Sequence, residues 1–242
     1  MIHWSASTGP LPSLERRVHV WAVALDDARI DARSWLGRLS AQEQARAQRF
    51  KFANDRRRYI VAHAALRDIL AGHLKIAAGD LQFVDGANGK PRLAAALASS
   101  GFEFNLSHSH ERALVAATEG LVVGIDVEFV RSDFGFHEVA ERFFTRREVS
   151  ALGALPPSLQ RQAFYKTWTS KEAFLKAKGT GLSGALDEVE IVLISGSRVA
   201  INASVAGWSL TELDPGEGYE GALVVEGDRA APIHRYRWQP TS

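Results

Sequence analysis

The chain has 242 residues, of which 46% are hydrophobic and 24% are charged, a composition typical of a globular protein with a buried core. Its 29 lysines and arginines nearly balance its 28 aspartates and glutamates, so the overall charge favours neither nucleic acid nor an anionic membrane as a partner. Cysteine does not occur, which excludes disulfides, thiolate metal sites and cysteine nucleophiles.

The N-terminal half reads as strands alternating with helices. Ser40 followed by Glu43 has the spacing of a capping box and predicts a short helix up to about Arg49. Asn54 or Asp55 is expected to cap a longer helix, whose apolar face consists of Ile60, Ala64, Leu66 and Leu70. Alternation of apolar and polar residues predicts strands over 18–25, 81–84, 102–106 and 113–118, with a turn at 85–89.

The C-terminal half repeats this pattern. A strand over 121–127 is followed by a helix over 137–144, and Thr145 with Glu148 forms a second capping box for a helix to Leu152. A long helix is expected from about Leu159, ending where Gly179 takes the left-handed conformation. The remaining expected strands cover 189–193, 199–203, 208–213, 221–225 and 233–238.

The order of these elements predicts an α+β fold made of two similar halves related by pseudo-twofold symmetry. The joint is expected near Glu119-Gly120, which gives halves of 1–119 and 120–242. No apolar run approaches the roughly 20 residues that cross a bilayer, and the N-terminal segment has no basic region followed by an apolar stretch. We therefore expect a cytoplasmic protein that binds neither membrane nor nucleic acid.

Two acidic residues stand out in the segment Gly124–Glu128. On a strand, Asp126 and Glu128 point to the same side while Ile125 and Val127 point to the core. Hard carboxylate oxygens on one face suit Mg2+, which binds one or two carboxylates and completes its shell with water and phosphate. The same pattern also occurs on an ordinary solvated strand face.

A second group of residues lies on the long helix, in the segment Trp168–Lys176. Trp168, Glu172 and Lys176 are spaced four residues apart and so form one stripe of the helix surface. This stripe could carry catalytic residues. It could equally be an exposed Glu-Lys pair beside a tryptophan of the core, and the segment alone does not distinguish the two.

The third group is Asn105–His110. Ser107 and His108 are adjacent on an extended chain and face opposite ways, so they do not form a nucleophile-base pair with each other. His108 and His110 could both bind zinc, although no third ligand is evident. Donation of hydrogen bonds to an anion is the more natural role for Ser107 and His108.

These groups follow a definite order with further motifs between them. Gly89-Lys90-Pro91 comes first, then Phe104–Ser109, Gly124–Glu128, Phe143-Phe144 ahead of Glu148, and Trp168–Ala173 followed by Lys176, Gly179 and Gly181-Leu182. This order resembles the 4′-phosphopantetheinyl transferase superfamily from about Ser40 to Leu182. The length and paired halves look like its Sfp-type branch, named for the surfactin-synthetase activator, and not like the half-sized trimeric holo-acyl-carrier-protein synthases.

The resemblance implies an enzyme that moves phosphopantetheine from coenzyme A to a serine of an apo acyl- or peptidyl-carrier protein, releasing adenosine 3′,5′-bisphosphate. Asp126, Glu128 and Glu172 match the family's metal-site positions, which hold Mg2+ against the pyrophosphate. Lys176 matches the lysine at the transferred phosphate. The resemblance places coenzyme A phosphate contacts in the first half and the metal site with the catalytic helix in the second. One site from two fused halves would make the protein a monomer.

Further positions match residues that grip the nucleotide. The resemblance assigns Lys90, Ser107 and His108 to the nucleotide phosphates, with His108 on the 3′-phosphate, and Arg46 to the same 3′-phosphate. The chain departs from the family at Glu43, where some relatives have a phosphate-binding lysine. It also departs at Tyr59, which replaces a small hydroxyl residue.

Glu172 is interpreted as the general base, acting directly or through a metal-bound water. An acidic carrier protein would suit Arg142, Arg146 and Arg147, with Phe143 and Phe144 beside them. Two alternatives stay open: a metal-dependent phosphohydrolase acting on a nucleotide-like substrate, and a carrier-protein-binding homologue that has lost turnover.

Overall fold

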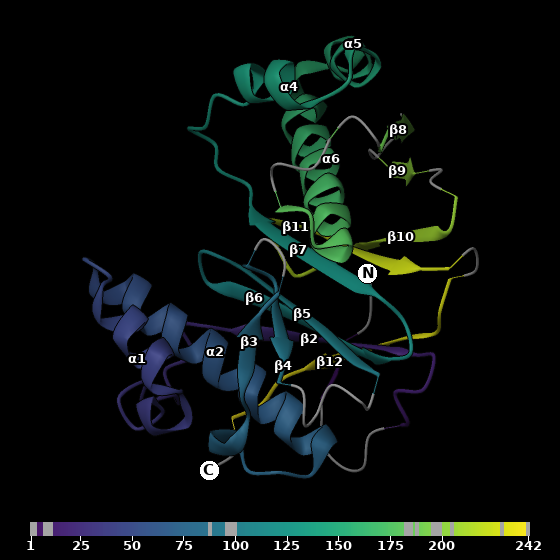
Figure 1. Cartoon of the computed structure of the whole chain (residues 1–242). Helices are drawn as coiled ribbons and strands as arrows, with labels where there is room; N and C mark the ends of the chain where they lie inside the picture. Colours follow the sequence, from purple (N-terminus) through teal and green to yellow (C-terminus); the bar gives the residue numbers. More distant parts are fainter. Residues whose placement is uncertain are drawn as a thin grey trace.

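The protein forms two α+β units, each with a long helix packed against a sheet (Figure 1). The computed structural model describes residues 4–6, 12–86, 89–94, 101–181, 186, 189–194, 200–203, 206–227 and 230–240. The two long helices, α2 (Ala53–Leu74) and α6 (Pro157–Lys178), have 22 residues each. The predicted α+β fold with paired halves is confirmed.

The N-terminal unit is built on a mixed five-stranded sheet in the order β1-β12-β2-β6-β5. Its strands are β1 (Ser5–Ala6), β2 (Val18–Ala24), β5 (Phe102–Ser109), β6 (Arg112–Glu119) and β12 (Ile233–Arg237). Helices α1 (Ala41–Gln48) and α2 lie beside this sheet, with 3-10 turns at Leu36–Arg38 and Ala78–Asp80 and a two-stranded ribbon of β3 (Phe83–Asp85) and β4 (Pro91–Leu93).

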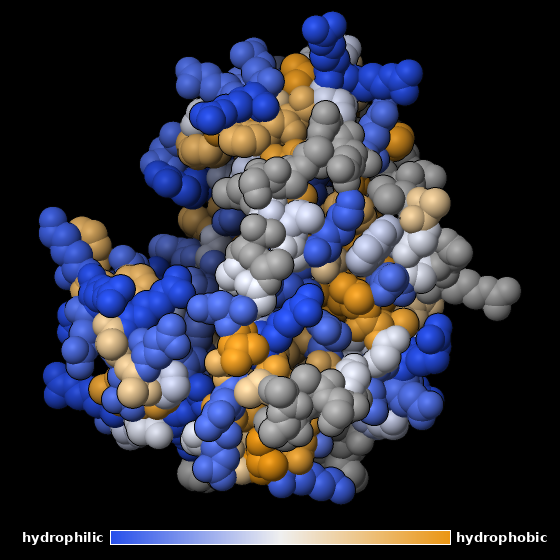
Figure 2. Space-filling model, in the orientation of Figure 1, coloured by the Kyte–Doolittle hydropathy of each residue, from blue (hydrophilic) through white to orange (hydrophobic). Residues whose placement is uncertain are grey.

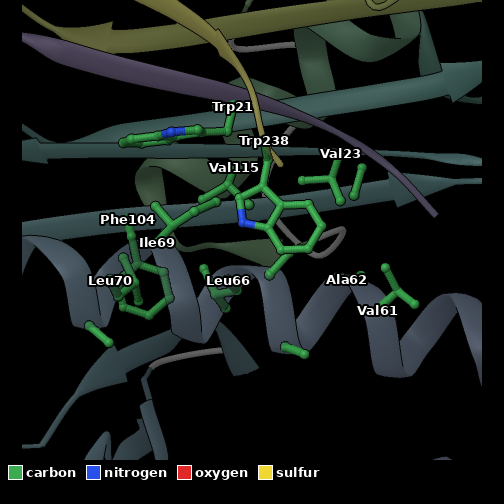
Figure 3. Close-up of a cluster of buried hydrophobic side chains, with 14 of the residues drawn as sticks. Trp21, Val23, Val61, Ala62, Leu66, Ile69, Leu70, Phe104, Val115 and Trp238 are labelled. Atoms are coloured by element: carbon green, nitrogen blue, oxygen red, sulfur yellow. The ribbon is translucent and has the colours of Figure 1, made fainter. Parts of the chain in front are cut away.

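The alternation along β2 supplies both faces of this sheet. Trp21 and Val23 point towards α2, while Val18 and Val20 enter a separate core on the other face, so the strand is buried on both sides. Figure 3 shows the α2 side, where Leu66, Ile69 and Leu70 of the helix meet Trp21 and Val115 of the sheet. Trp238 from the end of the chain reaches the same core.

The C-terminal unit is built on an antiparallel three-stranded sheet in the order β10-β11-β7. Its strands are β7 (Val123–Phe129), β10 (Trp208–Leu213) and β11 (Tyr219–Glu226), and a ribbon of β8 (Ile191–Ile194) and β9 (Ala200–Ala203) lies near α6. Helices α4 (His137–Phe143) and α5 (Arg146–Ala154) lie at the far end of α6 from its contact with β7, as Figure 1 shows. Among the described residues, no helix combines the length and the apolar run that a membrane crossing requires.

Local signals in the sequence set most element boundaries. Both predicted capping boxes are present, Ser40 with Glu43 and Thr145 with Glu148, and α6 ends at Gly179 with φ 68°. The predicted cap of α2 is wrong: the helix begins at Ala53, after Phe52 in an extended conformation. Asp55 therefore lies within the first turn, where its charge faces the positive end of the helix dipole. Parts of the predicted turn at 85–89, the strand at 199–203 and the Gly181-Leu182 motif lie outside the described residues.

The end of the chain returns to the N-terminal sheet. β12 pairs in parallel with β2, with His234 opposite His19 and Tyr236 opposite Trp21. The sheet of the first half therefore contains a central strand from the last ten residues, and the two units are joined by more than the segment near Gly120. The halves 1–119 and 120–242 remain a prediction about domain organisation.

Candidate active site

Strand β7 presents two acidic side chains beside each other. It pairs with β11, where Asp126 lies opposite Ala222 and Glu128 opposite Glu220. Ile125 and Val127 have no exposed surface and belong to the core between the sheets. The alternation expected from the sequence is therefore present, and Asp126 and Glu128 share the opposite face of the strand.

Helix α6 lies directly on this strand because residue 124 is glycine. A Cβ atom at Gly124 would lie 2.1 Å from the carbonyl oxygen of Ala173 and 2.3 Å from the backbone nitrogen of Ala177. This close approach brings the helix stripe to the acidic face: the Lys176 Nζ lies 2.6 Å from the Asp126 Oδ1. Glu172 is one turn earlier on the same stripe.

Burial changes the proton affinity of the two glutamates beside Asp126. Asp126 is only 2% exposed. Burial raises the pKa of Glu128 to about 7, helped by the charges of Asp126 and Glu172 and opposed by a hydrogen bond from Ser109 and the charge of Lys176. Burial and the charge of Asp126 also raise the pKa of Glu172. Both glutamates thus lie beside Asp126 in a site where nearby positive charge does not offset their burial.

Two carboxylate oxygens in this cluster, Oδ2 of Asp126 and Oε1 of Glu172, are buried and have no hydrogen-bond partner among the described residues. Within the described part of the chain, no three His, Asp or Glu side chains already stand as a complete metal-binding group. Mg2+ does not require one, because it keeps several water or phosphate ligands and takes only one or two carboxylates. The unpartnered oxygens and the shared negative charge fit a divalent cation.

A group of basic side chains borders the carboxylates. His108 lies on β5 with part of its ring exposed, and desolvation together with the positive charges of His63, Lys176 and Arg46 lowers its pKa to about 4. Since the charges of Arg46 and Lys176 both act on this imidazole, the three side chains lie near one another, and their role as phosphate contacts stays a prediction. The guanidinium of Arg46 also lies 5.7 Å from the ring centre of Tyr59, one of the two departures from the family.

Lys90 directly precedes β4, and its side chain reaches the start of β7. Its Nζ donates a hydrogen bond of 3.0 Å to the carbonyl oxygen of Val123, and desolvation lowers its pKa. Its side chain also approaches Gly179, the residue that ends α6. Lys90 therefore lies at the junction of the two units, next to both elements that carry the acidic cluster.

Glu43, the other departure, has a structural role. Its carboxylate caps α1 through Ser40 and also binds Arg67, whose Nη2 lies 2.7 Å from the Glu43 Oε2, and His63. Although burial opposes it, hydrogen bonding to His63, Ser40 and Arg67 lowers the pKa of Glu43 to about 2. The capping part of this arrangement was readable from the sequence, but the link to α2 was not.

A cavity of about 340 Å³ opens beside Glu128 and was not predicted from the sequence. Aromatic side chains from β7, α6 and the segment between β7 and α4 form much of its wall, including Phe129, Phe134, Tyr165 and Trp168. The only signal in the sequence was the position of Trp168 on the same stripe as Glu172. Figure 2 shows the molecular surface hollowed between the α1–α2 corner and the region of α4.

Comparisons with known proteins point to one family. The profile of the 4′-phosphopantetheinyl transferase superfamily matches residues 122–224, and that of the 4′-phosphopantetheinyl transferase N-terminal region matches 29–120. The chain is 37% identical to the 4′-phosphopantetheinyl transferase HetI of Nostoc sp. over 98% of this chain and 96% of that protein. It is 29% identical to Sfp of Bacillus subtilis strain 168, over 67% and 70% of the two chains.

Among solved structures, a holo-(acyl-carrier-protein) synthase from Bacillus anthracis in complex with CoA aligns with 45% of this chain and 98% of its own, at 22% identity and a TM-score of 0.37. That likeness is too low to support an argument. The identity to HetI extends over almost the whole of both proteins, and the two family profiles adjoin without overlap at the junction of the halves. The chain therefore belongs to the 4′-phosphopantetheinyl transferase superfamily.

Proposed function

We propose that the protein transfers the phosphopantetheine group of coenzyme A to a serine of an apo acyl- or peptidyl-carrier protein and releases adenosine 3′,5′-bisphosphate. The observation that carries this proposal is the junction of β7 and α6, where Lys176 contacts Asp126 beside Glu128 and Glu172. Whole-length identity to a named phosphopantetheinyl transferase supports the same reaction.

Asp126, Glu128 and Glu172 would hold Mg2+, since the unpartnered oxygens of Asp126 and Glu172 and the clustering of the three carboxyl groups suit a divalent ion. The bound ion would supply Lewis acidity and charge neutralisation to the pyrophosphate of coenzyme A. Arg46, His108 and Lys90 would bind the nucleotide phosphates, with Arg46 and His108 on the 3′-phosphate. The positive charges that already lower the pKa of His108 would favour such an anion.

Two side chains of the protein would then act in the transfer step, one on the proton of the carrier serine and one on the negative charge of the leaving group. Glu172 would take the proton of the carrier serine as the serine oxygen attacks the β-phosphorus of coenzyme A. The bond from this phosphorus to the oxygen it shares with the α-phosphate breaks, and adenosine 3′,5′-bisphosphate leaves. Lys176 would stabilise the charge that develops on that leaving oxygen.

The carrier protein would approach from the side of α4 and α5. Arg142, Arg146 and Arg147 are exposed there and would attract an acidic partner. Of the two phenylalanines expected beside them, Phe144 is buried in the core, while Phe143 is half-buried against Trp168. The aromatic cavity beside Glu128 would receive the pantetheine arm or the serine-bearing helix.

We further propose that the protein is a cytoplasmic monomer. One chain supplies every residue of this site, so a second copy is not needed to complete it.

Incubation of the protein with coenzyme A, Mg2+ and an apo carrier protein tests the proposal. Intact mass of the carrier should show addition of one phosphopantetheine group, with equimolar adenosine 3′,5′-bisphosphate in solution. Release of small-molecule products without carrier modification would instead identify a phosphohydrolase. Carrier binding with no product of either kind would identify a homologue without turnover. A panel of carriers from fatty-acid, polyketide and peptide synthesis would show which is served.

Substitution of Glu172 by Gln tests its role as base. We expect kcat to fall by about a hundredfold to ten-thousandfold, the range for loss of a general base, while coenzyme A binding measured by calorimetry changes little. Glu226→Gln, an exposed residue at the end of β11, is the matched control and should retain full activity. Loss of coenzyme A binding in Glu172→Gln would show that the residue acts chiefly as a metal ligand and would contradict its role as the base.

A further inference from the structure

The two sheets meet at their edges beside the active site. β5 is the last strand of the five-stranded sheet and β7 is the last strand of the three-stranded sheet, and the two strands contact each other without joining into one sheet. Ile125 and Val127 of β7 are fully buried there. Their backbone N–H groups need acceptors, because an unpaired buried N–H costs about as much as a lost hydrogen bond.

Side chains of β5 supply these acceptors in a regular series. Asn105 Oδ1 accepts from the N–H of Ile125 at 2.8 Å, Ser107 Oγ from Val127 at 3.3 Å, and Ser109 Oγ from Phe129 at 3.1 Å. Each donor lies 20 residues after its acceptor, so the two strands run parallel and keep a constant register over these three pairs. Along a strand, every second side chain points to the same face and every second N–H points to the same edge. The side chains of β5 and the N–H groups of β7 therefore repeat at the same spacing and pair one to one. We call Asn105, Ser107 and Ser109 the seam ladder.

Two members of the seam ladder also bind the acidic residues. Ser107 Oγ donates to Asp126 Oδ1 at 2.8 Å, and Ser109 Oγ donates to Glu128 Oε2 at 2.7 Å. Each serine therefore accepts from the backbone of one β7 residue and donates to the carboxylate of the residue before it. The same hydroxyl fixes both the strand position and the side-chain rotamer.

The hydroxyl of Ser107 has no capacity left for a phosphate. It donates its one proton to Asp126 and accepts from the Val127 N–H and from the Lys176 Nζ at 2.9 Å. A hydroxyl offers one donor and two acceptor positions, so all three are in use. The side chain is also only 6% exposed. Donation to a nucleotide phosphate, the role that the sequence indicated, would require Ser107 to release Asp126.

We propose that Asn105, Ser107 and Ser109 are positioning residues, whose side chains join the two sheets and set where the carboxylates of Asp126 and Glu128 lie. The proposal rests on the proposed function for its catalytic consequence, but the joining of the sheets is independent of it. Ser109 is the sharpest test, because it touches Glu128 and the Phe129 N–H and makes no contact with Lys176 among the hydrogen bonds of the described residues.

Three variants separate positioning from simple stability. Ser109→Ala removes the hydroxyl, and Ser109→Thr keeps it on a residue that suits a strand. Ser209→Ala is the matched control, since Ser209 is also half-buried on a strand and donates its hydroxyl to the carbonyl oxygen of Val225, but lies on β10 at the other edge of the same sheet.

Hydrogen exchange measures directly whether the side chains of β5 protect the backbone N–H groups of β7. In Ser109→Ala, the backbone amides of peptides covering 123–129 should exchange about tenfold faster than in the parent, because the Phe129 N–H loses its acceptor. Ser109→Thr should restore slow exchange, and Ser209→Ala should leave these peptides unchanged. This measurement needs no substrate, so it decides the joint even if no carrier protein is modified.

Metal affinity and kinetics test whether Ser109 positions the carboxylate of Glu128 for metal binding. With adenosine 3′,5′-bisphosphate present, the affinity for Mn2+ measured by electron paramagnetic resonance should fall about tenfold in Ser109→Ala, the usual cost of losing a residue that orients a ligand. The Mg2+ concentration for half-maximal rate should rise to match, and KM for coenzyme A should change little. Ser109→Thr should recover both values.

Unchanged exchange at 123–129 in Ser109→Ala would overturn the proposed joint. A lower melting temperature with unchanged Mn2+ affinity and Mg2+ dependence would overturn the positioning role and leave Ser109 only structural. Absence of carrier modification by the unaltered protein would refute the proposed function and not the ladder, because the exchange and Mn2+ measurements would still give their own results.

Discussion

At the scale of single residues, the active site combines groups that the sequence places far apart. Ser107, Asp126 and Lys176 come from two strands and a helix, yet the Lys176 Nζ contacts both of the others. The arrangement explains why no one motif was sufficient to identify the site. A carboxylate pair on a strand and a Glu-Lys pair on a helix are each common in proteins. They indicate an active site here because the helix and the strand bring the two pairs into contact.

His108 should discriminate coenzyme A from dephospho-coenzyme A. If it binds the 3′-phosphate, His108→Ala should lower kcat/KM for coenzyme A by about tenfold to a hundredfold, the value of a hydrogen bond to a charged group. Dephospho-coenzyme A has no 3′-phosphate and should be used equally well by both proteins. His137→Ala, an exposed histidine on α4, serves as control. Equal losses for both substrates would exclude this role for His108.

Glu43 should make folding stability depend on acidity. Its pKa is about 2 in the folded protein and 4.5 as the ordinary value, so its contribution is complete above pH 4.5 and is lost as pH falls towards 2. The shift corresponds to about 3 kcal/mol. In urea unfolding, Glu43→Gln should therefore be destabilised at pH 7, and its difference from the parent should shrink by pH 3. A difference that stays constant between these pH values would contradict the assignment.

At the scale of elements, the contact between β7 and α6 decides whether the site forms. Gly124 is the position of closest approach, and the helix presents Glu172 and Lys176 only because its backbone can lie on the strand. The same part of α6 is also fixed by a fully buried ion pair one residue before Glu172, with the Lys171 Nζ at 2.9 Å from the Glu148 Oε2 of α5. The helix is thus held at both the strand and its neighbouring helix.

Gly124→Ala should separate α6 from β7. The added Cβ would lie within 2.3 Å of two backbone atoms of the helix, which no side-chain rearrangement can relieve. We expect a loss of about 3 kcal/mol or more in unfolding free energy and a large loss of activity. Gly153→Ala on α5 is the control, because a Cβ there meets nothing within 4 Å, and it should be neutral or stabilising by up to about 1 kcal/mol. Equal stability of the two variants would refute the close contact.

At the scale of the whole molecule, the chain end closes the first unit. β12 lies between β1 and β2, and Trp238 packs edge-to-face on Trp35 with ring centres 5.2 Å apart. A division at residue 119 therefore leaves the N-terminal sheet without a strand that it contains in the complete chain. The two units should consequently unfold together.

Trp238→Ala tests this dependence. Removal of a large buried side chain should cost about 3 to 5 kcal/mol, and urea unfolding should remain a single transition shifted to lower concentration. Phe52→Ala is the control because that side chain is 63% exposed, and its effect should be within about 0.5 kcal/mol. Two separate transitions, with only one of them shifted, would show that the units fold independently.

The sequence by itself determined the helices, the caps at Ser40, Thr145 and Gly179, the alternation that puts Asp126 and Glu128 on one face of their strand, and the family. These features depend on neighbours within a few residues, so they can be read locally. The missed start of α2 at Ala53 shows the limit of local reading, since Asn54 and Asp55 are good caps that the fold did not use.

Only the tertiary structure decided how these pieces meet. The place of β12 beside β2, the link from Glu43 to Arg67 and the contact of Lys176 with Asp126 join residues distant in the chain. The seam ladder is of the same kind, because Ser109 becomes a positioning residue only where two sheet edges run in step. Such contacts form when burial brings unpaired polar groups together, and a sequence pattern does not specify which of them will meet.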